Sequence, residues 1–262
     1  MLTLTTLASG SSGNCTLVSD GATHILIDAG ISARRITTAL KGLGVAPETL
    51  AAVLVTHEHS DHISGLTTLT KQLPLPVYAS HGTARELCCR IPALETRLHP
   101  FTPGVCFGLG TLEVETFATP HDTVQSNGYA VSAGGRKAAV VTDLGCCTEE
   151  VRRGIQGAHL LVAETNHDVD WLRSGPYPYF LKARVLGDRG HLSNEAGAEM
   201  ICTVAEAGAR TVVLAHLSKE NNTPARAYDT VRAALERRGA AVDRDICLDV
   251  APRSEPGPVY TV

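Results

Sequence analysis

Short apolar runs typical of buried strands alternate along the chain with segments whose apolar residues recur at helical spacing. Ile36, Leu40 and Leu43 continue this spacing from Ile31, and Gly44 marks the end of the helix. We therefore expect helices at residues 31–43, 83–90, 148–155, 194–207 and 224–238. Strands are expected at residues 2–8, 15–19, 24–28, 50–56, 112–117, 128–132, 138–142, 159–163 and 211–215. The mixture predicts a protein of the α/β (α+β) class, and the pattern by itself leaves the topology open.

The chain is expected to form one domain followed by a short tail. No Gly/Ser-rich linker, shift in composition or short-period repeat divides its 262 residues. Hydrophobic residues make up 44% and charged residues 19%, which is typical of a folded protein with a sizeable core. We therefore assign residues 1–250 to a single domain and the Pro-containing residues 251–262 to a loose C-terminal tail.

Net charge and the distribution of apolar residues exclude several classes of protein. The 23 basic and 27 acidic residues give a formal charge of −4, which excludes binding of nucleic acid through bulk positive charge and leaves only local contacts. No apolar run approaches the roughly 20 residues that span a bilayer, and the first residues lack the basic and apolar parts of a secretory signal. The eight cysteines show no C-x-x-C pair and no disulfide framework. We therefore expect a cytoplasmic protein with reduced thiols and no membrane partner.

The strongest chemical signal is the segment VTHEHSDH at residues 55–62, directly after an expected buried strand. It places His57, His59, Asp61 and His62 within six residues. Imidazole and carboxylate groups at this density suit borderline divalent metals such as Zn²⁺. A solvated polar turn would not need three histidines, because histidine is not a favoured turn residue. The segment therefore indicates a metal site.

This H-x-H-x-D-H segment resembles the signature of the metallo-β-lactamase superfamily, and later residues follow in the order of that superfamily. His121 in ATPHD, Asp143 in VVTDLG and His216 in VLAHLS each come after an expected strand. The resemblance covers nearly the whole chain and implies a four-layer αββα sandwich. It also implies that Asp28, in LIDAG, orients the histidine segment.

The same resemblance implies a site for two divalent metal ions. It assigns the ligands in two sets bridged by one carboxylate: His57, His59 and His121 for one ion, Asp61, His62 and His216 for the other, and Asp143 for both. Nitrogen and oxygen ligands without a thiolate accept Zn²⁺, Mn²⁺ or Fe²⁺, so the ligand types do not choose among these metals. A single histidine is more often an ordinary surface or core residue, so the later ligands depend on their order behind the H-x-H-x-D-H segment.

Further segments resemble one group of the superfamily, the YycJ/WalJ group. They are ASGSSGN at residues 8–14, AETNHD at 163–168, YPYFLKARV at 177–185, GHLSNEA at 190–196 and HLSKENN at 216–222. That group is associated with 5′-to-3′ exonuclease activity on double-stranded DNA, which neither composition nor spacing indicates by itself. The resemblance therefore implies a phosphodiesterase in which a hydroxide shared by two metals attacks the phosphodiester bond of DNA.

His191 and Asp61 are the expected catalytic residues. His191 resembles the histidine that precedes a helix in phosphodiesterases of the superfamily, where it is proposed to protonate the leaving oxygen. The alternative is that His191 is merely a neighbour of the helix N-cap, with Ser193 or Asn194 as the cap.

Substrate contacts are expected from two polar segments. They are Lys182 and Arg184 in the first segment, and Ser218, Lys219 and Asn221 in the second. The basic residues have an equally ordinary interpretation as surface charge.

Two other activities of the superfamily are disfavoured by the ligand set. Secreted β-lactamases have a cysteine ligand where this chain offers Asp143, and flavo-diiron oxidases have a glutamate where it offers His59. Two alternatives to a DNA exonuclease stay open. One is a phosphodiesterase for small cyclic or nucleotide-like esters, since no inserted arm for a polymer is evident. The other is a catalytically silent metal-binding regulatory protein, which would not need seven ligands together with His191.

Overall fold

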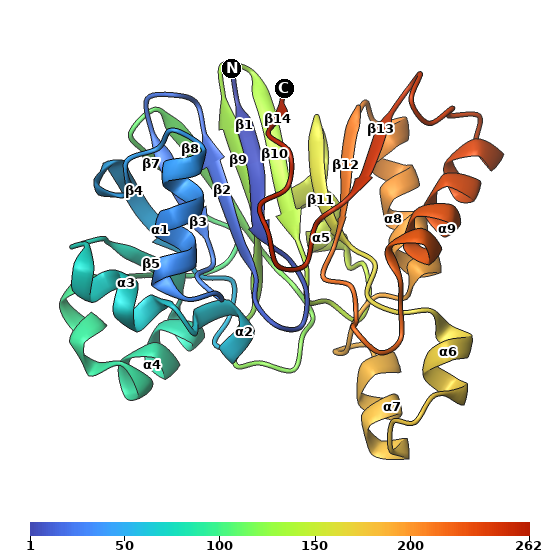
Figure 1. Cartoon of the computed structure of the whole chain (residues 1–262), viewed down its shortest axis with the longest axis horizontal. Helices are drawn as coiled ribbons and strands as arrows, with labels where there is room; N and C mark the ends of the chain where they lie inside the picture. Colours follow the sequence, from blue (N-terminus) through green and yellow to red (C-terminus); the bar gives the residue numbers. More distant parts are fainter.

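The computed structural model describes residues 1–262 as two seven-stranded sheets that pack face to face (Figure 1). The strands of the first sheet are β1 (Thr3–Ala8), β2 (Cys15–Ser19), β3 (His24–Ile27), β4 (Leu50–Leu54), β5 (Val77–Ser80), β6 (Leu98–Phe101) and β14 (Tyr260–Thr261). Those of the second sheet are β7 (Cys106–Leu109), β8 (Leu112–Ala118), β9 (Asn127–Ala133), β10 (Arg136–Val141), β11 (Leu160–Glu164), β12 (Thr211–Ala215) and β13 (Cys247–Val250). Their orders are β14-β1-β2-β3-β4-β5-β6 and β13-β12-β11-β10-β9-β8-β7.

Two groups of helices cover the outer faces of the sheets (Figure 1). The first sheet is covered by α1 (Ala33–Gly42), α3 (Leu66–Gln72) and α4 (His81–Arg90), and the second by α5 (Glu149–Ile155), α8 (Asn194–Glu206) and α9 (Pro224–Arg237). The other helices are α2 (Ser60–Ile63), α6 (Val169–Ser174), α7 (Tyr179–Leu186) and the 3₁₀ helices η1 (Pro47–Thr49) and η2 (Pro92–Arg97). None of these helices combines the length and the apolar character needed to cross a membrane. All eight cysteines are free thiols.

Three apolar clusters hold the layers together. Between the sheets, residues of the first sheet such as Leu4 pack with residues of the second such as Leu160. A second cluster lies between the first sheet and α1, α3 and α4, and a third between the second sheet and α5, α8 and α9. Because each sheet is buried on both faces, the predicted four-layer αββα sandwich is confirmed.

The strands that precede the candidate ligands end at one edge of the sandwich. In the first sheet β3 and β4 are parallel, and in the second β10, β11 and β12 are parallel. β8 runs in the same direction as β10, because both pair antiparallel with β9 between them. Side chains at or just past the carboxyl ends of these strands therefore gather together: Asp28, His57, His121, Asp143, Glu164 and His216.

The predicted elements are confirmed within a few residues, and local capping explains the differences at helix starts. α1 begins at Ala33 rather than at residue 31, because the Ser32 side chain accepts a hydrogen bond from the Arg35 N–H and caps the helix. Ser193 caps α8 in the same way. The pattern missed β5, β6, β7 and β13 and the short helices α2, α3, α6 and α7, because elements of this length show little periodicity.

The C-terminal residues are not a loose tail, and this part of the prediction is wrong. Tyr260 and Thr261 form β14 and pair antiparallel with β1, while Leu2 and Val262 exchange backbone hydrogen bonds of 3.0 and 2.9 Å. The Tyr260 side chain is buried, and its hydroxyl donates to the carboxylate of Asp249 on β13 at 2.7 Å. The tail therefore links the two sheets. A two-residue strand has no period that a sequence could reveal, and its partner lies at the other end of the chain.

Replacing Tyr260 by alanine is expected to lower the free energy of unfolding by about 3 kcal/mol, because a buried aromatic ring and its hydrogen bond are lost. Urea denaturation measures the difference. Val259→Ala is the matched control, since Val259 is 54% exposed and its loss should change stability by less than about 0.5 kcal/mol. Equal stability of all three proteins would show that the terminal strand does not hold the sandwich together.

Candidate metal centre

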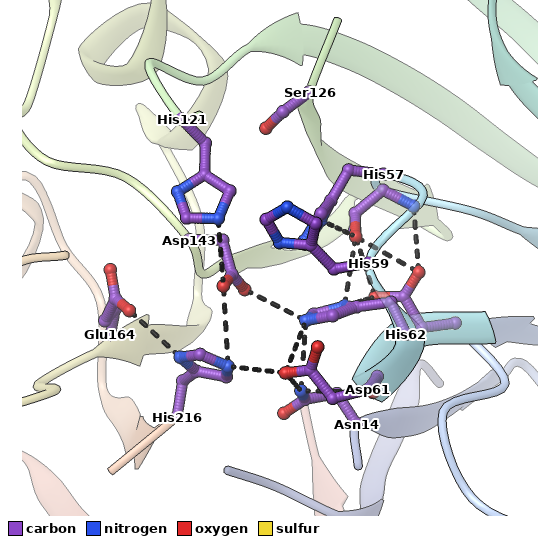
Figure 2. Close-up of polar contacts among 12 residues, drawn as sticks. Asn14, His57, His59, Asp61, His62, His121, Ser126, Asp143, Glu164 and His216 are labelled. Carbon is purple, nitrogen blue, oxygen red and sulfur yellow. Dashed lines mark hydrogen bonds and ion pairs between the residues drawn. The ribbon is translucent and has the colours of Figure 1, made fainter. Parts of the chain in front are cut away.

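Four side chains from the segment after β4 lie together at the edge of the sandwich (Figure 2). His57 and His59 lie on the loop after the strand, whereas Asp61 and His62 belong to α2. His57 and His62 are fully buried with ring centroids 4.0 Å apart, and His59 and Asp61 are half-buried. The neighbouring loop approaches so closely that a Cβ at Gly30 would lie 1.7 Å from the carbonyl oxygen of Asp61, so only glycine fits there.

Asp143 is the carboxylate on which histidines from both sheets converge (Figure 2). It follows β10 and is buried. Its Oδ2 lies 3.3 Å from Nε2 of His62. Its Oδ1 lies 3.4 Å from Nε2 of His216 and 3.7 Å from Nε2 of His121. One carboxylate thus touches members of both predicted ligand sets.

Three residues at the strand ends have a left-handed backbone. The φ angles of Asp28, Asp143 and His216 are 62°, 61° and 56°. The remaining non-glycine residue of this kind is Asp243, which is exposed. Residues with a Cβ rarely adopt such angles, at a cost of about 1–3 kcal/mol each, and they persist where surrounding contacts hold them. Their concentration at one edge is typical of a functional site.

The donor atoms at this edge suit divalent metal ions. Nε2 of His57 and Nε2 of His121 are buried and have no hydrogen-bond partner in the protein, a state that costs about 1–3 kcal/mol per group. Candidate ligand atoms lie within 4.8 Å of one another in four overlapping groups: His57, His59 and His121; His57, His62 and Asp143; Asp61, His62 and His216; and Asp143, Glu164, His191 and His216. Lone pairs of imidazole and carboxylate groups that lack other partners are what such a metal would bind.

Hydrogen bonds behind the histidines fix the orientation of their rings. Nδ1 of His62 donates to Oδ2 of Asp28 at 2.7 Å, and Thr56 donates both its N–H and its O–H to the same carboxylate. Nδ1 of His121 donates to the carbonyl of Gly190 at 3.0 Å. In both rings Nδ1 is engaged and Nε2 is left for the centre, as is usual for metal-ligating histidines. Asp28 thus contacts the residue that it was expected to orient.

Glu164 is a further buried residue of the centre that the sequence pattern did not single out. It ends β11, is fully buried, and places Oε1 2.7 Å from Nδ1 of His191 and 3.0 Å from Nδ1 of His216. Its Oε2 accepts hydrogen bonds from the backbone N–H groups of Leu144 and Leu192. One carboxylate therefore orients two histidines. The available signal was an acidic residue that closes the apolar run LLVAE.

Buried charges of opposite sign determine the protonation of the metal-free centre. Burial alone would raise the pKa of Glu164, but His191 and His216 lower it to about 2. Burial disfavours charge on His216 as well, yet Asp143 and Glu164 raise its pKa to about 10. Burial holds the pKa of His57 well below its usual value. His57 is therefore ready to donate a lone pair at neutral pH, whereas His216 carries a proton that a metal would displace.

A pocket of about 250 Å³ opens over the centre. Five residues predicted to act on the substrate line it: Asp61, His191, Arg184, Ser218 and Asn221. Arg184 is paired there with Asp122. Lys182 and Lys219 do not line the pocket, and Nζ of Lys182 donates instead to the carbonyl of Arg173 at 2.7 Å.

Two more polar side chains reach the centre without having been predicted. Nδ2 of Asn14 lies 3.1 Å from Nε2 of His62. Oδ1 of Asp122 lies 3.4 Å from Nε2 of His121 and 3.9 Å from Nε2 of His59. Both are placed by loop packing, and no spacing within the H-x-H-x-D-H segment points to them.

Known proteins share this sequence and architecture. The family model described as "Beta-lactamase superfamily domain" matches residues 23–217. The chain is 38% identical over 239 residues to the exodeoxyribonuclease YycJ of Bacillus anthracis, which covers 90% of each chain. It is 36% identical over 250 residues to the exodeoxyribonuclease WalJ of Streptococcus pneumoniae serotype 2 (strain D39 / NCTC 7466), covering 94% of this chain and 93% of the relative. The metallo-β-lactamase fold protein YhfI from Bacillus subtilis superposes with a TM-score of 0.74 at 16% identity, over 100% of both chains.

The matched range and the lengths of the relatives identify the family. Residues 23–217 include every strand end from which the candidate ligands come. The two relatives match over nearly their whole length, and the likeness to YhfI supports the fold. The chain therefore belongs to the β-lactamase superfamily, within it to the YycJ/WalJ group, and is a metal-dependent hydrolase.

Proposed function

We propose that the centre holds two divalent metal ions, Zn²⁺ or Mn²⁺, with Fe²⁺ as a further candidate. The proposed ligands are His57, His59 and His121 for one ion, Asp61, His62 and His216 for the other, and Asp143 between them. The nitrogen and oxygen donors, the unpartnered Nε2 atoms and the contacts of Asp143 with both sets support this assignment. When bound, two such ions would activate water and neutralise charge on a phosphodiester.

The proposed activity is that of a 5′-to-3′ DNA exonuclease, which hydrolyses phosphodiester bonds from the 5′ end of a strand. The observation that carries it is a donor set fit for two metals with His191 on the wall of the same pocket. Phosphodiester hydrolysis needs both charge neutralisation and a proton for the leaving oxygen, and this site offers groups for each. The names of the relatives, both exodeoxyribonucleases, support DNA as the substrate.

His191 is proposed as the acid that protonates the leaving oxygen. Its Nδ1 is held by Glu164 at 2.7 Å, so Nε2 is the nitrogen available to a substrate. Although burial opposes a charge on the ring, the Glu164 carboxylate raises the pKa of His191, which favours the protonated form near neutral pH. The side chain is 20% exposed and can be reached from the pocket. Glu164 is then a positioning residue that acts through His191.

The proposed substrate contacts fall into two groups by position. Arg184, Ser218 and Asn221 line the pocket and are proposed to contact the nucleotides beside the scissile bond. Lys182 and Lys219 lie outside it and are proposed to contact phosphates further along the strand.

The protein loaded with Mn²⁺ or Zn²⁺ is expected to degrade an end-labelled DNA duplex from its 5′ ends. On a denaturing gel, a 3′-labelled strand should shorten progressively, whereas a 5′ label should appear at once in a short product. Asp143→Ala is the control for contaminating nucleases, because loss of the carboxylate between the ligand sets should abolish metal retention and activity. Turnover of bis-p-nitrophenyl phosphate without DNA degradation would favour a small-ester phosphodiesterase. No turnover of either substrate by metal-loaded protein would favour a regulatory protein.

Metal affinity is expected to rise with pH, because imidazole ligands bind metal only when deprotonated. The sign follows from His216, whose pKa of about 10 means that the metal-free protein carries a proton there at pH 7 and releases it on binding. Calorimetric titration with Mn²⁺ in two buffers of different ionisation enthalpy counts the protons released. Equal heats in the two buffers would contradict displacement of protons by metal.

His191→Ala is expected to lower kcat on DNA by about 10²–10⁴-fold while largely sparing bis-p-nitrophenyl phosphate, whose leaving group departs without a proton. Metal content, measured by atomic absorption, should stay unchanged. Glu164→Gln should show a smaller preference for the activated substrate, because Glu164 holds the proposed metal ligand His216 as well as His191. Equal losses on both substrates would exclude the acid role, and loss of metal would make His191 a ligand.

A further inference from the structure

The helix α7 presents two aromatic side chains to solvent. Tyr179 is 86% exposed and Phe180 is 71% exposed, and α7 contributes no buried residue to any core. Together α6 and α7 form an arm, residues 169–186, that projects from the sandwich (gold in Figure 1). Two consecutive aromatic residues exposed to this degree favour a contact surface, because water solvates such rings poorly.

Contacts with the rest of the protein fix the position of the arm, although its outer surface is exposed to solvent. In α6, the Trp171 ring stacks against the guanidinium of Arg226 at 4.1 Å. Lys182 donates to the carbonyl of Arg173 and so ties α7 to α6. Arg184 pairs with the loop after β8. The two exposed rings therefore lie on a positioned element.

The same helix also lines the metal pocket. Leu181 and Arg184 of α7, with Tyr177 just before it, form part of the pocket wall. The volume of about 250 Å³ is below the roughly 300–1,000 Å³ of pockets that enclose a whole small molecule. A polymer with one phosphodiester at the centre must therefore continue over the rim, which α7 helps to form through Leu181 and Arg184. Tyr179 and Phe180 lie on the same helix and are exposed outside the pocket.

The charge of this region favours a polyanion. In a chain of net charge −4, residues 169–190 carry four basic side chains, Arg173, Lys182, Arg184 and Arg189, against two acidic ones, Asp170 and Asp188, and one of the four, Arg184, is paired with Asp122. Aromatic rings interspersed with basic side chains are the usual means of binding single-stranded nucleic acid, since rings stack on bases while cations contact phosphates.

We propose that the arm binds the DNA strand that enters the metal centre, with Tyr179 and Phe180 stacking on its unpaired bases. This inference rests on the proposed nuclease function and extends it to a preference for single-stranded or frayed ends over blunt duplexes. Every base offers a face for stacking, so the contact is independent of sequence. Such a contact suits an enzyme that removes each nucleotide in turn.

The test compares the wild-type holoenzyme with the double variant Tyr179→Ala/Phe180→Ala. The probe is a labelled single-stranded oligothymidylate whose phosphorothioate linkages resist hydrolysis. By fluorescence anisotropy the double variant should bind about 5- to 100-fold more weakly, with an unchanged salt dependence because no charge is lost. Val259→Ala removes an exposed apolar side chain from the C-terminal segment and should bind as the wild type does. Turnover of bis-p-nitrophenyl phosphate should be equal in all three proteins, since the altered side chains do not line the pocket.

Each other outcome identifies what has failed. Wild-type affinity in the double variant, with a wild type that degrades duplex DNA, overturns the arm as a strand-binding element and leaves the nuclease proposal standing. A wild type that turns over bis-p-nitrophenyl phosphate but neither binds nor degrades DNA overturns both proposals. If sedimentation shows that the wild type is a dimer and the double variant is a monomer, the two rings mediate contact between two copies of the chain. That outcome overturns strand binding.

Discussion

The buried carboxylate of Asp143 is the group on which the geometry of the whole centre depends. Removing a carboxylate from water costs several kcal/mol unless positive charge and hydrogen bonds surround it. Here the compensating groups are His62 from α2, which follows β4 of the first sheet, and His121 and His216, which follow β8 and β12 of the second. Because the partners come from both sheets, they meet only when the sheets are packed with these strand ends at one edge. Folding of the sandwich and assembly of the centre are therefore the same event.

Two further buried carboxylates, Asp28 and Glu164, contact the histidines that surround Asp143. Asp28 holds His62 and Glu164 holds His216, so the rings of these candidate ligands are fixed by negative groups that are themselves satisfied by backbone donors. In the metal-free protein, the raised pKa of His216 favours a proton on that ring, which offsets part of this negative charge. Bound cations would take over that task, which couples metal binding to the stability of the surrounding loops.

The parts of this structure that depend on local pattern could be predicted from the sequence. The H-x-H-x-D-H segment lies in one short stretch of the sequence, and the apolar runs that become β8, β10 and β12 predict where the later candidate ligands follow. Glu164 and Asn14 could not be predicted as parts of the centre, because their partners lie far from them in the sequence and come close only in the folded chain. The arm could not be predicted either, because α6 and α7 are short and only the tertiary structure shows that Tyr179 and Phe180 face solvent whereas Leu181 lines the pocket.

The pairing of β14 with β1 makes the first strand wait for residues that lie more than 250 positions further along the chain. Synthesis at about 5–20 residues per second takes roughly 10–50 s for 262 residues, and during most of that time one edge of the first sheet has open N–H and C=O groups. Open edges are templates on which other strands add. A nascent chain stalled before Tyr260 would already contain every candidate ligand, and its hazard would be aggregation through the bare edge of β1.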